Sequence, residues 1–308
     1  MRIGFFGTPE LASHCLQNLC ENFQIAFVVA GLDKPYGRNR KIRICETKDT
    51  AMCQDIDVLQ PTDLKDADFF EKLKQYNADI FVVVAYGRII PEHIFNLPRL
   101  KTINLHPSLL PKYRGAAPIR WALINGEKET GITIQQINEK LDAGDIILQE
   151  SFPVDENINA AELKECVIEK GSQMLKQAIN ELNDGTAALI KQNDDEATYC
   201  GKIEKTAAQI VWNKSATEIH NLVRGLNPKP VAWTTFRNKN IKIWKTQLVD
   251  FEIDLKPGEI RKYTKKKLIV GTGDGIIEIL EIQPEVKRPM DGLSFINGQR
   301  ISENDCFI

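Results

Sequence analysis

Asn104, His106 and Asp142 are the side chains whose types and spacing best suit chemistry on a polar group. A short run from Thr102 to Leu105 predicts a strand, which Pro107 ends because proline has no amide donor. Asn104 and His106 share one face of this strand, because side chains of a strand alternate between its faces. An amide N–H and an imidazole N–H at one strand end can both donate hydrogen bonds to a developing oxyanion.

Asp142 is predicted to lie at the tip of a turn. Gly131 to Ile137 indicates a second strand, and Leu141 to Asp145 indicates a turn that leads into a further strand, Ile146 to Gln149. We expect the glycine of this turn to permit a tight bend, which would hold Asp142 at the loop tip. Taken singly, a histidine after a strand is most often structural, and an aspartate before glycine most often belongs to a turn.

The combination of these residues is too long and specific to arise by chance. NxHPSLLPxxRGAAPxxW is followed in the chain by ETGxTIxxxxxxLDAGD. This stretch resembles the 10-formyltetrahydrofolate-dependent formyltransferases, and most closely the methionyl-tRNA formyltransferases. The resemblance covers nearly the whole chain, through IGFFGTPELA, VVVAYGRIIP, RGLNPKPVAW and IVGTGDGIIEI. It implies an enzyme of translation initiation that passes the formyl group of 10-formyltetrahydrofolate to the α-amino group of methionine on initiator tRNA.

The resemblance also implies roles for the polar side chains. Asn104 would donate a hydrogen bond to the oxygen of the attacked formyl group. His106 would donate as well, best as an imidazolium, which a nearby Asp142 would favour through its opposite charge. Asp142 would also help a water molecule carry the proton from the amine towards N10 of the folate. The folate-binding residues implied in this way are Tyr86, Gly87, Ile90, Ser108, Leu109, Leu110 and Pro111.

The elements that must position these residues indicate an α/β fold. Apolar strands are predicted at Ile3 to Phe6, Ile25 to Ala30 and Asp79 to Ala85. Between the first two we expect a helix that Thr8 caps and that ends near Cys20. Such alternation predicts a doubly wound, mainly parallel sheet, which is a Rossmann-like domain. The opening GFFGTPEL lacks the GxGxxG spacing of dinucleotide sites, so nicotinamide binding is the weaker interpretation.

The last third of the chain has a different pattern. A helix is expected from about Ala160 to Asn183, and the polar run from Asp184 to Cys200 indicates a linker. Beyond it, short runs such as Lys239 to Val249 and Leu268 to Ile282 predict a small β domain. The resemblance implies that this domain is an OB-like β-barrel that binds tRNA. We expect a catalytic domain over residues 1–183, a linker over 184–203 and a C-terminal domain over 204–308.

Two segments are rich in cations, Asp33 to Lys48 and Lys256 to Lys267. Taken alone, each indicates a solvated charged surface, as most such runs do. The resemblance implies instead that the first segment enters the acceptor arm of the tRNA, with Arg38 as its key arginine. The second would then be a further grip on phosphates. The tRNA-binding residues expected on this basis are Arg38, Arg40, Lys41, Arg43, Lys265, Lys266 and Lys267.

The composition is that of an ordinary globular protein, with 308 residues, 43% of them apolar and 27% charged, and a formal net charge of −2. No run approaches the roughly 20 apolar residues of a membrane span, and the start has no export signal. The scattered cysteines indicate reduced thiols, and the histidines do not form a metal-ligand set. We expect a cytoplasmic monomer with a folate co-substrate, a tRNA partner, no metal and no membrane.

Three other functions are compatible with parts of this sequence. A sugar-nucleotide N-formyltransferase or a formyltetrahydrofolate hydrolase would use the same Asn104, His106 and Asp142. The sugar-nucleotide N-formyltransferase should not need RGLNPKPVAW or the basic C-terminal segment. A tRNA-binding protein without activity would not need the three polar side chains. The presence of both features favours formyl transfer to methionyl-tRNA.

Overall fold

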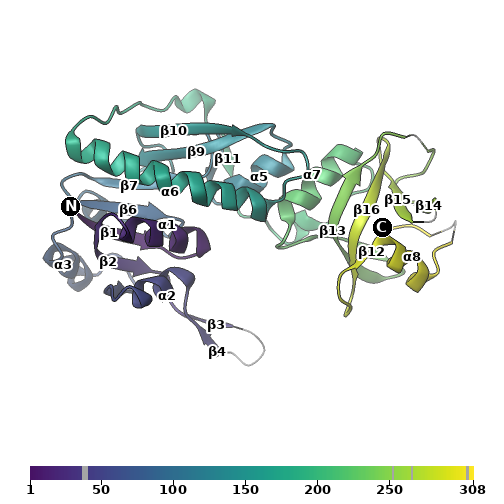
Figure 1. Cartoon of the computed structure of the whole chain (residues 1–308), viewed down its shortest axis with the longest axis horizontal. Helices are drawn as coiled ribbons and strands as arrows, with labels where there is room; N and C mark the ends of the chain where they lie inside the picture. The colour runs from purple at the N-terminus through teal and green to yellow at the C-terminus, as the bar shows by residue number, and fades with distance from the viewer. Residues whose placement is uncertain (37–40, 252, 265, 303–304) are drawn as a thin grey trace. The chain divides into compact units, whose positions relative to one another are not determined.

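The computed structural model describes residues 1–36, 41–251, 253–264, 266–302 and 305–308 (Figure 1). The chain divides into two compact units. The first unit contains residues 1–116, 131–152 and 164–200, and the second contains residues 117–130, 153–163 and 201–308. The domain boundaries expected from the sequence stay a prediction. Within the described residues, no helix is both long and apolar enough to cross a membrane.

The first unit is built on a seven-stranded sheet. In spatial order its strands are β10 (Ile146–Pro153), β9 (Glu129–Gln136), β7 (Thr102–His106), β6 (Ile80–Val84), β1 (Arg2–Gly7), β2 (Gln24–Ala30) and β5 (Val58–Leu59). The five strands from β7 to β5 pair in parallel, and β9 pairs antiparallel with β7. Buried apolar runs such as IFVVV in β6 are typical of strands that are covered on both faces.

Helices cover both faces of this sheet, which confirms the doubly wound α/β architecture. The helices of the unit are α1 (Glu10–Cys20), α2 (Glu46–Cys53), α3 (Ala67–Gln75), α4 (Glu92–Phe95) and most of α6 (Ala160–Asp184). On one face, Phe6 and Phe81 pack in a core that also contains Phe69 of α3 and Ile94 of α4. On the other face lies α6 (Figure 1), whose Gly171 packs directly against Leu105 of β7. Strand alternation therefore sends neighbouring residues into two separate cores.

Parallel pairing brings the carboxyl ends of β1, β2, β6 and β7 to one edge of the sheet, where open α/β sheets hold their sites. The loops that follow these strands therefore meet at this edge. Thr8, just after β1, does not cap α1 as expected, because Pro9 takes the N-cap position without a side-chain hydrogen bond. The Thr8 hydroxyl instead donates to the backbone oxygen of Tyr86, 3.2 Å away, and so ties the ends of β1 and β6 together.

Residues 185–200, most of the expected linker, are hydrogen-bonded to the first unit. Ile190 forms a bridge to Ile146 of β10. The short strand β11 (Tyr199–Cys200) pairs in parallel with β8 (Arg114–Gly115), which follows the loop after β7. In the chain, the 3-10 helix η1 (Asp194–Glu196) lies between Ile190 and β11. The segment therefore lies next to the residues that follow His106 in the chain.

The second unit contains an antiparallel sheet, which confirms the predicted C-terminal β domain. Its strands are β12 (Ala232–Phe236), β13 (Lys239–Leu248), β16 (Ile276–Pro284), β15 (Lys267–Gly271) and β14 (Ile260–Tyr263), with β17 (Met290–Asp291) paired to β16. Its helices are α5 (Pro118–Ile124), α7 (Ala216–Leu226), α8 (Gly292–Gln299) and the 3-10 helix η2 (Thr206–Ala208). A capping box between Ser215 and Glu218 begins α7. Trp212, Phe236, Phe295 and Phe307 form the aromatic part of the core.

Candidate active site

The structure brings Asn104, His106 and Asp142 to one place in the first unit. Asn104 and His106 lie on β7, and the turn between β9 and β10 places Oδ2 of Asp142 3.6 Å from Nδ1 of His106. The His106 side chain is buried, and Asn104 is half-buried. Within the described part of the chain, the amide of Asn104 makes no hydrogen bond. It is therefore free to donate to a bound group.

The proton positions on His106 follow from its partners. Nε2 lies 2.8 Å from the backbone oxygen of Tyr113, and because a carbonyl only accepts, Nε2 must carry a hydrogen. Burial lowers the pKa of His106 below its usual value, although Asp142 and the Tyr113 carbonyl act in the opposite direction. This direction does not favour the resting imidazolium that the sequence interpretation expected, because desolvation acts against the charged ring. In the neutral ring, the Nδ1 lone pair faces Asp142.

Asp142 is held by donors from two other segments. The backbone N–H of Gly115 donates to Oδ2 at 2.9 Å, and the side chain of Gln135 donates to Oδ1 at 3.3 Å. Asp142 itself adopts a left-handed φ of 48°, which is uncommon for a residue with a side chain. The turn needs its glycine for another reason than expected. A Cβ atom on Gly144 would lie 1.7 Å from the carbonyl oxygen of Gln136, so only glycine allows this close approach.

The residues after β6 lie beside this site, because β6 and β7 are neighbours with Val84 opposite Leu105. Tyr86 is buried, and its hydroxyl has no hydrogen-bond partner among the described residues. Gly87 is exposed with φ of 79°, whereas Ile90 is buried in the core. The apolar side chain presented to solvent is Ile89, which is 89% exposed and which the sequence interpretation left out.

The loop after His106 is stabilised by its own polar groups. The Ser108 hydroxyl donates to the Lys112 carbonyl, and Thr133 of β9 donates to the carbonyl of Ser108. The backbone N–H of Leu110 in turn donates to the Thr133 hydroxyl. Ser108 and Leu110 are buried, while Leu109 and Pro111 are half-buried. Within this loop, the half-buried pair offers the apolar surface that a flat ligand could contact.

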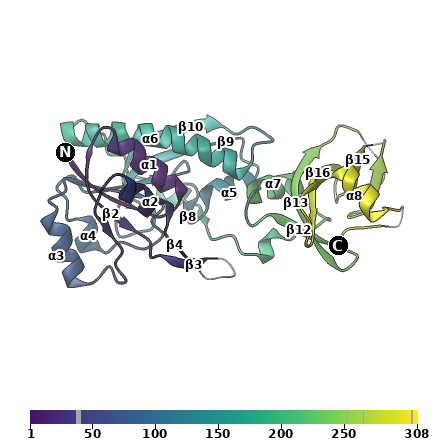
Figure 2. The same ribbon diagram turned by 60° about the horizontal axis from the view of Figure 1, so that its bottom comes forward.

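The expected tRNA-binding residues are distributed over both units. Arg38, Arg40 and Lys265 lie outside the described residues. Lys41 and Arg43 belong to β4 (Lys41–Arg43), which pairs with β3 (Lys34–Tyr36) as a hairpin after β2, as Figure 2 shows. Arg43 forms an ion pair with Glu46 at 2.7 Å. Lys266 is exposed, and Lys267 pairs with the buried Glu278 at 2.7 Å.

A half-buried cluster of polar side chains holds the base of the hairpin in place. Nζ of Lys48 donates to Asp33 and to Gln60, both at 2.6 Å, and Gln60 donates to the Gly31 carbonyl. The hydrogen bond from Lys48 lowers the pKa of the Asp33 carboxyl, to which Gln60 also contributes. Lys48 therefore anchors the base of the hairpin, and its charge is paired with Asp33.

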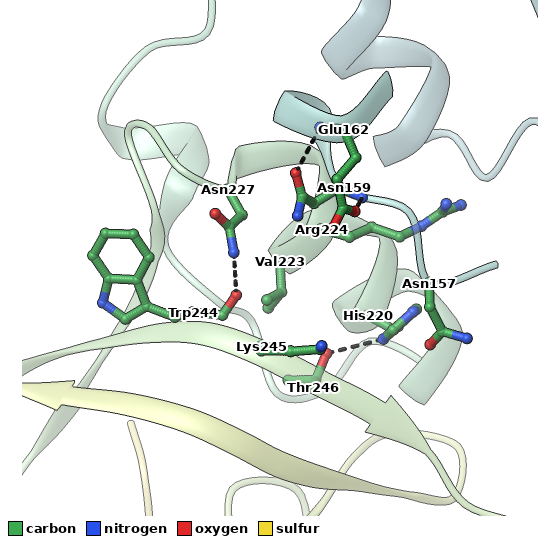
Figure 3. A pocket seen from close by; sticks show the side chains of 10 residues that line it. All are labelled: Asn157, Asn159, Glu162, His220, Val223, Arg224, Asn227, Trp244, Lys245 and Thr246. Carbon is green, nitrogen blue, oxygen red and sulfur yellow. Dashed lines mark hydrogen bonds between the residues drawn. The ribbon is translucent and has the colours of Figure 1, made fainter. Parts of the chain in front are cut away.

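A separate polar pocket lies in the second unit, between α7 and β13 (Figure 3). Its volume of about 50 Å³ suits one or two water molecules and not a folate or a base. His220 in its wall is hydrogen-bonded through both ring nitrogens, to Thr246 and to the backbone oxygen of Glu156. Asn227 donates to the Trp244 carbonyl. None of the site residues expected from the sequence lines this pocket.

Sequence reasoning missed the residues that hold Asp142 in place. Gly115, Gln135 and Gln192 contact Asp142 by their side chains or backbone, and Arg114 contacts Gln192. RGAAP was visible as a motif, but no local pattern pointed to a glutamine in a polar run. Among the described residues, no three histidine, cysteine, aspartate or glutamate side chains gather as metal ligands.

Comparisons with known proteins identify the same family in the N-terminal and the C-terminal part of the chain. The Formyl transferase family model matches residues 1–179, and the model for the Formyl transferase C-terminal domain matches residues 202–300. The Methionyl-tRNA formyltransferase of Clostridioides difficile is 43% identical over 303 residues, which cover 98% of each chain. That of Clostridium novyi is 40% identical over 302 residues, with the same coverage.

Two solved structures resemble the fold at lower identity. The sugar 3N-formyl transferase WlaRD, crystallised with dTDP and 5-N-formyl-THF, is 23% identical with a TM-score of 0.67, covering 94% of this chain and 99% of its own. HypX from Aquifex aeolicus, in complex with tetrahydrofolic acid, is 21% identical with a TM-score of 0.66. It is matched over 97% of this chain and 47% of its own. At such identity these two structures support the fold alone.

Proposed function

The chain belongs to the methionyl-tRNA formyltransferase family, and we propose that it performs formyl transfer with Asn104, His106 and Asp142 as its catalytic residues. The donor would be 10-formyltetrahydrofolate, and the acceptor would be the α-amino group of methionine on initiator tRNA. One observation carries this proposal. The side-chain amide of Asn104, which makes no hydrogen bond within the described residues, lies on the same strand as His106, whose Nδ1 faces the Asp142 carboxylate at 3.6 Å.

The first step would be attack of the amine nitrogen on the formyl carbon. A free α-amino group titrates near 7.7–8.0, and its ester titrates lower, so the amine needs no strong base to become nucleophilic. The formyl oxygen gains negative charge as the tetrahedral intermediate forms. The Asn104 amide would donate a hydrogen bond to this oxygen, because a fixed donor stabilises charge that develops only in the transition state.

The second step would move one proton and break one bond. Nδ1 of His106 would accept the proton that the attacking nitrogen loses, since Nε2 already carries its hydrogen. Asp142 would stabilise the imidazolium that results, by its negative charge 3.6 Å away. The same proton would then pass to N10 of the folate, directly or through water, as the C–N10 bond breaks. Formylated methionine and tetrahydrofolate would leave, and the pair would return to its starting state.

We also propose the binding surfaces for the two substrates. The half-buried Leu109 and Pro111 and the loop after β6 lie at the same sheet edge as His106, which supports a folate site there. For the tRNA, we propose that Arg38 of the first unit and Lys266 of the second contact its phosphates. Lys267 and Arg43 would contribute less, because each is engaged with a carboxylate of the protein.

The test is an acceptor competition with purified protein. Incubation with 10-formyltetrahydrofolate and charged initiator tRNA should yield formyl-methionine, detected after the ester is hydrolysed. Parallel reactions would contain a dTDP-amino sugar or water alone as the acceptor. We expect formylation of the tRNA at a much higher kcat/KM than of the sugar, and no rapid release of formate in water.

The competing outcomes are distinct. Preferred formylation of the amino sugar would identify a sugar-nucleotide N-formyltransferase, and release of formate without an acceptor would identify a hydrolase. Full-length relatives at about 40% identity favour the tRNA acceptor over the sugar acceptor, whose structural neighbour is far more distant.

A further inference from the structure

Gln192 lies in a polar connecting segment, and its side-chain amide has polar partners at both ends, with three acceptors sharing the two hydrogens of Nε2. Its Nε2 lies 3.0 Å from the Asp142 carbonyl, 2.8 Å from the Gly144 carbonyl and 3.0 Å from Oε1 of Gln135. Its Oε1 accepts from the guanidinium of Arg114, at 3.1 Å from Nε and 2.8 Å from Nη2. The carbonyls only accept and the guanidinium only donates, so the amide has one possible orientation.

These contacts form an ordered chain that ends on the Asp142 carboxylate. Arg114 donates to Gln192, Gln192 donates to Gln135, and Gln135 donates to Oδ1 of Asp142. Gln192 also grips the backbone of the turn on both sides of Ala143. Side chain and backbone of Asp142 are therefore held through one amide group. Asn138 also donates to the backbone of this turn, at the Ala143 carbonyl, but it does not contact Asp142.

Arg114 provides a fixed support for this chain of hydrogen bonds. Its side chain is buried, and Nη2 also forms an ion pair with Asp194 at 2.8 Å. Burial opposes the charge of Arg114, but hydrogen bonds to Asp194 and Tyr199 outweigh it and raise the pKa. The guanidinium thus stays charged and keeps the oxygen end of Gln192 turned away from the turn.

We propose that Gln192 is a positioning residue for Asp142, which it holds beside His106 so that the carboxylate can stabilise the imidazolium formed during proton transfer. This inference rests on the proposed function. The left-handed φ of Asp142 supports it, because a residue with a side chain keeps that conformation only when its surroundings enforce it. A shift of about 1 Å in a catalytic group can cost a factor of about 100 in rate.

Two substitutions separate positioning from mere anchoring of Arg114. Gln192→Met keeps the length of the side chain but neither donates nor accepts, and we expect kcat to fall about 10- to 100-fold with little change in either KM. Gln192→Glu keeps and strengthens the contact with Arg114, but it turns a carboxylate oxygen towards three acceptors. It should lose as much activity as Gln192→Met. A glutamate variant with wild-type kcat would overturn the proposal.

A matched control and a double-mutant cycle complete the test. Asn193→Ala changes the neighbouring residue, whose side-chain hydrogen bonds to described residues stay within its own 3-10 helix, and it should keep the wild-type rate. In an Asp142→Asn background, Gln192→Met should cost little more, because the residue acts through Asp142. Equal losses in both backgrounds would mean a general structural role and would overturn the inference. Thermal unfolding of each variant checks that the fold is retained.

The failure of this inference differs from the failure of the proposed function. A wild-type protein that forms no formyl-methionine would overturn both. A wild-type protein that forms it, together with a Gln192→Met variant of unchanged kcat, would overturn the positioning role alone.

Discussion

Each unit of the protein contains one buried histidine, and the two differ in a single contact. In both, Nε2 donates to a backbone carbonyl, from His106 to Tyr113 at 2.8 Å and from His220 to Glu156 at 3.1 Å. Burial lowers the pKa of both. Nδ1 of His220 accepts from the Thr246 hydroxyl at 3.0 Å. Nδ1 of His106 faces a carboxylate at 3.6 Å, beyond hydrogen-bond distance.

This difference separates a structural histidine from a reactive one. His220 has every ring nitrogen paired, so its surroundings are complete without a ligand. His106 has a lone pair that points at a negative group, an arrangement that becomes favourable only when a proton lies between them. The buried His106 and the half-buried Asp142, which Gly115 and Gln135 hold in place, can therefore accept one proton between them. Substitutions at His220 and at His106 should therefore have different effects on activity.

The largest effect on activity is expected at His106 and Asp142. His106→Ala and Asp142→Ala should each lower kcat by a factor of about 10²–10³, comparable to the loss of an oxyanion donor. Because the two residues act as a unit, the double variant should lose far less than the product of the single losses. Single-turnover rates with charged initiator tRNA would measure this.

His220→Gln is the control for that experiment, since it removes a buried imidazole of the other kind. It should leave kcat unchanged while the protein stays folded. If it lowered kcat as much as His106→Ala, or if the losses at His106 and Asp142 multiplied in full, the contrast between the two histidines would be lost.

The second effect concerns two cations of the first unit. Lys48 already binds Asp33 and Gln60, whereas Arg38 is expected to be available for a phosphate of the tRNA. One hydrogen bond to a charged group is worth about 1.5–3 kcal/mol, so Arg38→Ala should raise the KM for charged tRNA about 10-fold or more. The KM for the folate donor should hardly change. Lys72→Ala, which removes an exposed cation of α3, is the control. A normal KM for tRNA in Arg38→Ala at physiological salt would make the loop an ordinary solvated surface.

The third effect concerns His220 and the stability of the second unit at acid pH. Its folded pKa is lowered, so as the pH falls below about 6.5 the unfolded chain binds a proton before the folded one does. Stability from this residue is therefore full above about pH 6.5 and is lost as the pH falls towards the folded pKa. His220→Gln should lower the free energy of unfolding by about 1 kcal/mol at neutral pH and should weaken its decline on acidification.

Tryptophan fluorescence in urea would measure this stability. All four tryptophans, Trp121, Trp212, Trp233 and Trp244, lie in the second unit, so the signal follows that unit alone. An unchanged pH dependence in the variant would show that His220 is not the group that titrates.

The sequence predicted the fold and the three central polar residues because their signals are local. A strand that ends in NxHP and a turn that contains DAGD can each be recognised from a few consecutive residues. The support of Asp142 was missed because it joins Gln192 and Arg114 across long stretches of chain, in which a glutamine and an arginine look like ordinary polar residues. The imidazolium expected at His106 is disfavoured by burial, which the sequence did not predict either. Its burial depends on the packing of distant segments, which no motif reports.

The smallest effect should separate two adjacent lysines of the second unit. Lys266 is exposed, whereas Lys267 lies 2.7 Å from the buried Glu278. A phosphate contact made by a free cation releases a counterion, so Lys266→Ala should flatten the plot of log affinity for tRNA against log salt by about 1. Lys267 would first have to leave its carboxylate, and Lys267→Ala should therefore change the slope less while lowering the stability of the unit. Filter binding over a range of salt concentrations, with urea unfolding of each variant, separates these outcomes. Equal changes in slope would mean that the pair with Glu278 opens on tRNA and that a paired cation is as available as a free one.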